Sequence, residues 1–251
     1  MSTEKATALV LRVIDFSETS TVVTLFTREW GKVRALAKGG RRPKGPFESA
    51  LDLLALCRVV FVRKSSEALD LLTEAKLERR FRGRSGDLAS VYAGYYVAEL
   101  LNALTDDYDP HPELFDAATA TLADLSGEGS LSAIVLRFEM TALRHLGHQP
   151  ALAQCAECGQ PVEAVGRVPF GHLSGGVLCP RCRPGKLQVV AVSAGVIRAL
   201  ERLADPDSST WRRLELTAAV RNEARAVMNR YVSTILGRPA RMQPYLGQLG
   251  N

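Results

Sequence analysis

The stretch STVVTLFTREWGKVRALA, residues 20–37, decides how the first part of the chain folds. Residues 20–27 are rich in β-branched and aromatic side chains, which favour the pleated surface of a strand over a helix. Glu29-Trp30-Gly31-Lys32 supplies a turn, in which glycine adopts backbone angles that other residues avoid. Residues 33–37 return as the partner strand, so the stretch predicts a β-hairpin.

Three more strands are expected around this hairpin, at residues 7–16, 51–62 and 69–77. The segment 51–62 is apolar on both faces, as in a central barrel strand. Residues 39–46, GGRRPKGP, hold three glycines and two prolines and are expected to lack regular structure. Five short strands that begin with a meander predict a small OB-type β-barrel, and residues 1–80 form the expected first domain.

From Gly86 onward the apolar residues recur every three to four positions, which indicates helices. A short helix is expected from Ser193 to about Asp205, and a long one over residues 211–236. Residues 81–251 are therefore expected to form a helical domain, which makes the protein an α+β multi-domain chain. The first three helices are predicted through Val91–Leu101, Leu114–Leu125 and Leu131–His145.

Two cysteine pairs, Cys155-Ala-Glu-Cys158 and Cys179-Pro-Arg-Cys182, lie twenty residues apart. Each CxxC turn directs two sulfurs to one point, so the two turns predict a closed tetrahedral site for one structural zinc ion. Four sulfur ligands leave no position for water, which argues against a catalytic metal and against His172 as a ligand. Two disulfides, a redox-active CxxC or a site that has lost its metal are the alternatives. Residues 151–185 are expected to form a zinc-binding insertion.

The charge distribution suggests separate surfaces for separate partners. The net charge is +5, divided into +5 for residues 1–80, −6 for residues 81–150 and +6 for residues 151–251. No run of eighteen apolar residues and no signal-type N-terminus are seen, so no membrane partner is expected. A lone Cys57 beside a metal-type quartet argues for a reducing compartment and a cytoplasmic protein.

A basic stripe within residues 28–44 is the candidate site. In a strand, Lys32, Arg34 and Lys38 share one face, and the glycine-rich loop presents further cations beside them. Such a stripe suits a phosphate backbone, and Phe26, Trp30 and Phe47 could stack on bases. A solvated barrel face with these aromatics in the core is the alternative. The candidate DNA-binding residues are Lys32, Arg34, Lys38, Arg41, Arg42 and Lys44.

Other polar clusters predict less. Arg79, Arg80, Arg82 and Arg84 either extend the basic track or solvate a linker. The arginines of the last helix, Arg221 and Arg225 among them, are expected on a solvated face, because Glu215 and Glu223 dilute their charge. The acids Asp106, Asp107 and Asp109 are expected in a loop. No phosphate-binding loop, dinucleotide fingerprint, HExxH or GxSxG motif occurs, so no catalytic residue is predicted.

Taken together, these elements resemble the RecO family of DNA repair and recombination mediator proteins. The most specific parts are the opening segment, from Ala8-Leu9-Val10-Leu11 through Phe16-Ser17-Glu18-Thr19-Ser20 to Val23–Thr27 and Gly31-Lys32, and the loop Gly39-Gly40-Arg41-Arg42-Pro43-Lys44. The resemblance also includes the two CxxC pairs and a C-terminal Leu236-Gly237-Arg238 followed by Leu246. The zinc quartet is less specific, since some family members lack it.

The resemblance implies an N-terminal OB-type domain, a helical domain and a zinc segment. It implies binding to single- and double-stranded DNA, strand annealing, and a role with a RecR-type partner in helping a recombinase replace single-strand-binding protein. It implies a location at the nucleoid and no catalysis. Three alternatives remain from the residues alone: an OB-domain RNA-binding or translation factor, a metal-dependent nuclease, and a zinc-stabilised adaptor with an incidental basic face.

Overall fold

The computed structural model describes residues 2–247 except 43, 44, 46, 48, 49, 65–67, 207 and 208. Lys44 therefore lies outside the described residues. The chain divides into two compact units, Met1–Gly127 and Glu128–Asn251, which are described separately below. No helix among the described residues is long and apolar enough to cross a membrane.

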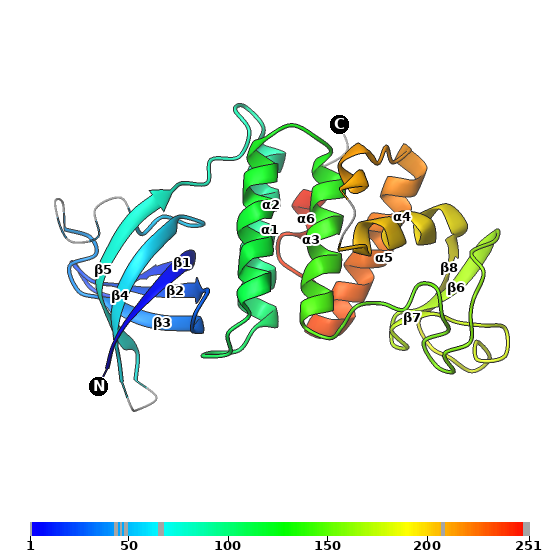
Figure 1. Ribbon diagram of the computed structural model, residues 1–251, viewed down its shortest axis with the longest axis horizontal. Helices are drawn as coiled ribbons and strands as arrows, with labels where there is room; N and C mark the ends of the chain where they lie inside the picture. Colours follow the sequence, from blue (N-terminus) through cyan, green and yellow to red (C-terminus); the bar gives the residue numbers. More distant parts are fainter. Residues whose placement is uncertain are drawn as a thin grey trace. The chain divides into compact units, whose positions relative to one another are not determined.

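The first unit begins with a closed five-stranded barrel (Figure 1). Around the barrel the strands follow the order β1-β2-β3-β5-β4, and only the β3–β5 pair is parallel. A shift of register between Val10 and Arg12 bends the long first strand, so that it can pair with both β2 and β4. The predicted OB-type fold is confirmed. The strands are β1 (Ser2–Asp15), β2 (Thr21–Thr27), β3 (Gly31–Ala37), β4 (Leu56–Arg63) and β5 (Asp70–Arg79).

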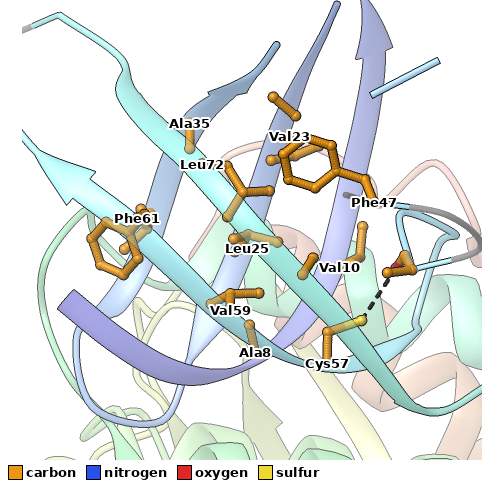
Figure 2. Packing of buried hydrophobic residues seen from close by; sticks show 14 of the residues in the cluster. Ala8, Val10, Val23, Leu25, Ala35, Phe47, Cys57, Val59, Phe61 and Leu72 are labelled. Atoms are coloured by element: carbon orange, nitrogen blue, oxygen red, sulfur yellow. Dashed lines mark hydrogen bonds between the residues drawn. The ribbon is translucent and has the colours of Figure 1, made fainter. Parts of the chain in front are cut away.

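The barrel interior is filled by small and branched apolar side chains together with the ring of Phe61 (Figure 2). Along each strand the inward residues alternate with outward ones. Phe47, from the loop after β3, packs into this core, and the Cys57 thiol donates a hydrogen bond to the Ala50 carbonyl at 3.1 Å. Phe26 is fully buried against Phe115 of helix α2 (Pro112–Ser126), with ring centroids 6.0 Å apart. Phe26 and Phe47 are therefore not available to stack on nucleic-acid bases.

The predicted fourth strand starts too early. Residues 51–55 form a turn, and β4 begins only at Leu56. Leu54 has a left-handed φ of 62° and donates its amide to the Val10 carbonyl, while Val10 donates to Ala55. The apolar character of this turn comes from its place against the core, which a strand of the same composition would share.

A helical hairpin completes the first unit. Helix α1 (Leu88–Leu104) is capped by Asp87, whose side chain accepts from the Ala89 amide, and α2 follows the loop 105–111. Two glycines allow close approach: a Cβ at Gly94 would meet the Phe81 ring at 2.3 Å, and one at Gly31 would lie 2.1 Å from the Asp109 carbonyl oxygen. The hairpin loop thus packs directly on the β2–β3 turn.

The second unit contains helices and a small sheet. Its three strands follow the order β7-β6-β8: β6 (Arg167–Gly171) and β7 (Gly176–Val177) lie within the 151–185 segment, and β8 (Val189–Ser193) follows it. The insertion between helices is therefore confirmed. The helices are α3 (Leu131–His145), α4 (Ala194–Ala204), the 3-10 turn η1 (Thr210–Arg213), α5 (Ala218–Leu236) and the short α6 (Gln243–Leu246).

Two expectations for the last helix are wrong. It starts at Ala218, because Thr217 caps it by accepting from the Val220 amide, and Trp211 belongs to the separate turn η1. Arg225 is buried rather than solvated, since its guanidinium pairs with the fully buried Glu139 of α3 and donates to Asn229. A buried charge requires such a partner. The partner lies 86 residues away in sequence, so the pattern of the last helix could not reveal it.

We expect Gly31→Ala to destabilise the protein by at least about 2 kcal/mol more than Gly86→Ala. Both glycines have positive φ, +67° and +75°, so both substitutions carry the left-handed cost of about 1–2 kcal/mol. Only at Gly31 would the new methyl group collide with the hairpin loop, because nothing lies within 4 Å of the position at Gly86. Urea denaturation measures the difference, and equal losses would show that the loop does not pack on the turn.

Candidate nucleic-acid interface and metal centre

The four cysteines of the second unit form a compact sulfur cluster. The Sγ atoms of Cys155, Cys158, Cys179 and Cys182 all lie within 4.8 Å of one another. The Cys158 and Cys179 sulfurs are 3.8 Å apart, which matches the ~3.8 Å edge of a tetrahedron with Zn–S bonds of about 2.3 Å. All four thiols are free of disulfides. The disulfide alternative is therefore contradicted, and the donor set fits a metal ion that takes four thiolates.

Backbone amides favour the thiolate forms of Cys155 and Cys179, whereas hydrogen bonds with the Cys158 and Cys179 sulfurs raise the pKa of Cys182 to about 12. Cys155 is buried, which opposes ionisation of its thiol, but backbone amides, first that of Cys179 at 3.4 Å, donate to its sulfur and lower its pKa to about 6. The pKa of Cys179 is also lowered, chiefly by the amide of Cys182. His172 stays outside the cluster, since its Nδ1 lies 3.0 Å from the Gln188 carbonyl. The expectation that His172 is not a ligand agrees with this geometry.

Basic residues of β3 occupy one outward face of the barrel, as their spacing predicts. Val33, Ala35 and Ala37 are fully buried, and the alternate positions point outward. The structure nevertheless separates these outward cations into two groups. The group nearest the β2–β3 turn contacts the helical hairpin, and the group nearest the β3–β4 loop does not.

Lys32 belongs to the first group and fastens the end of α1. Its ammonium donates to the Asn102 carbonyl at 3.0 Å and to the Thr105 carbonyl, and it lies 3.8 Å from an Asp107 carboxylate oxygen. These carbonyls end α1, where a helix leaves acceptors unsatisfied and its dipole favours a cation. The Lys32 side chain is only 13% exposed. This role removes Lys32 from the residues that we propose for DNA contact below.

Two arginines make more exposed contacts with the same hairpin. Arg34 forms an ion pair with Asp107 at 2.7 Å, and its side chain remains 59% exposed. Arg28 makes a two-point pair with Asp116 of α2, with both bonds at 2.9 Å. The hydrogen bond from Arg28 lowers the pKa of Asp116, so this contact is present near neutral pH and is lost as the pH falls through the lowered pKa. Asp107 of the α1–α2 loop and Asp116 of α2 thus pair with arginines of the barrel, which the sequence did not reveal.

The second group lies at the other end of the barrel. Lys38, Arg41 and Arg42 are exposed, and Lys38 and Arg42 have no ion-pair partner among the residues that the structure describes. Arg41 lies 3.3 Å from the exposed Asp15 carboxylate, a solvated pair of the kind that contributes little to stability. Its amide donates to the Thr19 carbonyl at 3.1 Å, which holds the cationic loop against the β1–β2 turn.

Sequence reasoning missed Arg12. The register places Arg12 opposite Thr24 and Thr24 opposite Arg34, so all three side chains share the outward face. Arg12 is exposed and has no ion-pair partner in the described part of the chain. Only strand pairing brings Arg12 into line with Arg34, because 22 positions separate them along the chain.

Arg79 and Arg80, where the last barrel strand ends, contact other residues of the first unit. Arg79 donates to the Thr119 carbonyl of α2 at 3.3 Å, and Arg80 lies 3.6 Å from an Asp52 carboxylate oxygen. Together with apolar residues they line a cavity of about 260 Å³ between the barrel and the end of α2. These contacts favour a structural role for Arg79 and Arg80 over an extension of the basic track.

Comparison with known proteins agrees with this architecture. The family model described as "Recombination protein O N terminal" matches residues 1–81, and "Recombination protein O C terminal" matches residues 85–243. The DNA repair protein RecO of Rhodopirellula baltica is 42% identical, over 95% of this chain and 97% of that protein. The proteins of the same name from Anaeromyxobacter dehalogenans strain 2CP-C and Myxococcus xanthus are 36% and 32% identical, with coverage of 95% or more of each chain.

The chain belongs to the RecO family of DNA repair proteins. The two RecO models divide the chain between residues 81 and 85. The division by compactness falls later, after Gly127, because α1 and α2 contact the barrel. The protein is thus a member of the RecO family with a four-cysteine cluster of the metal-binding type.

Thiol labelling tests the metal centre. In reduced native protein at pH 8 we expect the four cluster thiols to react with a disulfide reagent only after a strong chelator is added. Cys57 should stay unreactive until the protein unfolds, because burial, with the charges of Glu78 and Asp52, raises its pKa to about 12. Elemental analysis should return one zinc per chain, and freshly reduced protein without zinc would refute the site.

Lys32→Met and Lys38→Met form a matched pair that separates structure from binding. We expect Lys32→Met to lower the free energy of unfolding by about 1–3 kcal/mol, because it leaves the α1 carbonyls without a donor. Lys38→Met should change it by no more than about 0.5 kcal/mol, since Lys38 is exposed. Only Lys38→Met should reduce the salt dependence of DNA binding. Equal stability losses would show that Lys32 does not fasten the hairpin.

Proposed function

We propose that this chain is a recombination mediator that binds single- and double-stranded DNA without catalysis. The contact residues are Lys38, Arg41 and Arg42, with Arg12 and Arg34 beside them and Lys44 from the same loop. The observation that supports this proposal most is the exposed cationic face of an OB-type barrel, which combines Arg12 of β1 and Arg34 of β3 with the cations that follow β3. Membership of the RecO family supports the DNA-repair setting.

The chemistry follows from phosphate charge. Lysine and arginine side chains that replace condensed counterions release those ions, so binding is independent of base sequence and weakens with salt. Annealing requires two polyanions to approach each other, and a protein that neutralises phosphates lowers the repulsion between them. Because the proposed contacts are charge contacts, covalent bonds of the DNA stay intact throughout.

The proposed mediator role requires other proteins. In it, the chain acts with a RecR-type partner on DNA coated by single-strand-binding protein and helps a recombinase to replace that coat. This work takes place in the cytoplasm, at the nucleoid. The acids of the α1–α2 hairpin that face the barrel, Asp107 and Asp116, are engaged with Arg34 and Arg28. Protein partners are therefore expected to use other parts of the helical surface.

The metal proposed for the cysteine cluster is a single structural zinc ion. Four thiolates at tetrahedral spacing suit zinc, and the bound ion would supply folding energy to the 151–185 segment rather than reactivity. Cys155 and Cys158 hold it from one turn and Cys179 and Cys182 from the other. The segment would then keep β6 against α5, where the Phe170 and Tyr231 ring centroids lie 5.8 Å apart.

Charge reversal tests the proposed interface. Lys38→Glu, Arg41→Glu and Arg42→Glu in one protein should abolish annealing of complementary strands, with and without single-strand-binding protein. The matching triple substitution to alanine should make the log–log salt slope for single-stranded DNA shallower by about 2, at roughly 0.7 per phosphate contact. Reversing three exposed arginines of the second unit, Arg183, Arg202 and Arg213, changes the net charge equally and should leave both readouts unaltered.

The alternative functions give different results in the same experiments. An RNA-binding factor would prefer RNA over DNA strands of equal length. A nuclease would cleave labelled DNA in magnesium or manganese. An adaptor with an incidental basic face would show no change of DNA affinity in the charge-reversed protein. Any of these three outcomes would overturn the proposed function.

A further inference from the structure

The outward face of the barrel carries a row of apolar side chains beside the proposed phosphate contacts. Ile14 pairs with Val22, Val22 with Leu36, and Leu36 with Leu71, across strands β1, β2, β3 and β5. Residues directly opposite each other share a face, and the neighbouring Val23 and Ala35 are fully buried in the core. The four members of this apolar row therefore point outward. Ile14 is 42% exposed, and the other three are half-buried.

Cations border the apolar row on both sides. One step along the strands, about 7 Å away, lies the row that contains Arg12 and Arg34. On the other side, the exposed Lys38 directly follows the last residue of β3, and the loop with Arg41 and Arg42 comes next. Asp15 and Asp107 are the acids in contact with these cations, and each is paired with one of the arginines. Cations of β1, β3 and the following loop thus flank the apolar row on both sides.

Phe16 extends this surface at the β1–β2 turn. It is 66% exposed, and it directly follows the last residue of β1. Its amide donates to the Ser20 carbonyl at 3.0 Å, so the pairing of the hairpin continues through this position. The loop that carries Arg41 is held to the same turn through the Thr19 carbonyl. An exposed phenylalanine therefore stands next to the most available cations of the barrel.

We infer that Phe16 and the apolar row contact the unpaired bases of single-stranded DNA, while the bordering cations hold its phosphates. This inference rests on the proposed function and adds the class of group that distinguishes a single strand from a duplex. Every base has an apolar face that can stack on an aromatic ring, and a duplex hides these faces between its own base pairs. The flanking positive charge favours a polyanion with apolar bases over an apolar protein segment.

The test compares Phe16→Ala with Leu88→Ala, since both side chains are 66% exposed and Leu88 lies at the start of α1. Fluorescence anisotropy gives the affinity for three ligands of equal length: a single strand, a duplex, and a single strand of abasic units. We expect Phe16→Ala to weaken binding of the base-bearing single strand by about fivefold or more, the low end for one stacked base. Its affinities for the other two ligands should stay within about twofold, Phe16→Trp should restore binding, and Leu88→Ala should change nothing.

The possible failures are distinguishable. If Phe16→Ala binds the base-bearing strand as the unsubstituted protein does, the base contact is refuted, while salt-dependent binding by the unsubstituted protein still supports the proposed function. If Phe16→Ala weakens all three ligands equally, Phe16 acts on the cationic loop and the inference is also refuted. If the unsubstituted protein binds none of the three ligands, the inference and the proposed function fail together.

Discussion

The Lys32 ammonium donates hydrogen bonds to the carbonyls that end α1, and this contact decides which part of the barrel surface stays exposed to solvent. Around it, the Asp107 carboxylate reaches Arg34, the Tyr108 amide donates to the Lys32 carbonyl at 2.9 Å, and the Asp109 backbone packs on Gly31. Helix ends carry unsatisfied acceptors, and a lysine of an adjacent strand is a suitable donor for them. This contact directs the α1–α2 hairpin onto one half of the outward face of β2 and β3. The other half, toward the β3–β4 loop, keeps its cations and apolar residues in solvent.

In the second unit, the four-cysteine cluster and the buried pair of Arg225 with Glu139 hold separate segments of the chain together. The 151–185 segment contains short strands and many turns, and its own apolar cluster is small, so a bound metal would contribute much of its folding energy. The Arg225–Glu139 pair links α5 to α3 at a depth where neither charge could remain unpaired. The Arg225–Glu139 pair is buried, and the cluster closes its donor set with four sulfurs, although Cys158 itself is exposed. The functional surface that we propose therefore lies in the first unit.

Much of this architecture could be predicted because it is encoded locally. The β2–β3 hairpin follows from β-branched residues around a glycine turn, α3 follows from its apolar period and its Ser130 cap, and the sulfur cluster follows from two CxxC turns. Features that depend on partners far away in sequence could not be predicted. In the sequence, Lys32 has the same spacing and charge as Arg34 and Lys38, and its burial depends on α1, which lies some 70 residues later in the chain. The position of Arg12 and Phe16 beside the other cations follows from the pairing of β1 with β2, which the sequence does not specify. The turn at residues 51–55 has the apolar composition of a strand, so the sequence predicts a strand there.

Amide hydrogen exchange of the protein, with and without single-stranded DNA, can locate the DNA on the barrel. We expect new protection in residues 12–24 and 34–42, where the β1–β2 turn, the outward face of β3 and the cationic loop meet. Residues 102–109, already fastened by Lys32, should show no change. Protection confined to the second unit, or to the opposite barrel face around Lys5, Arg58 and Lys76, would contradict the account.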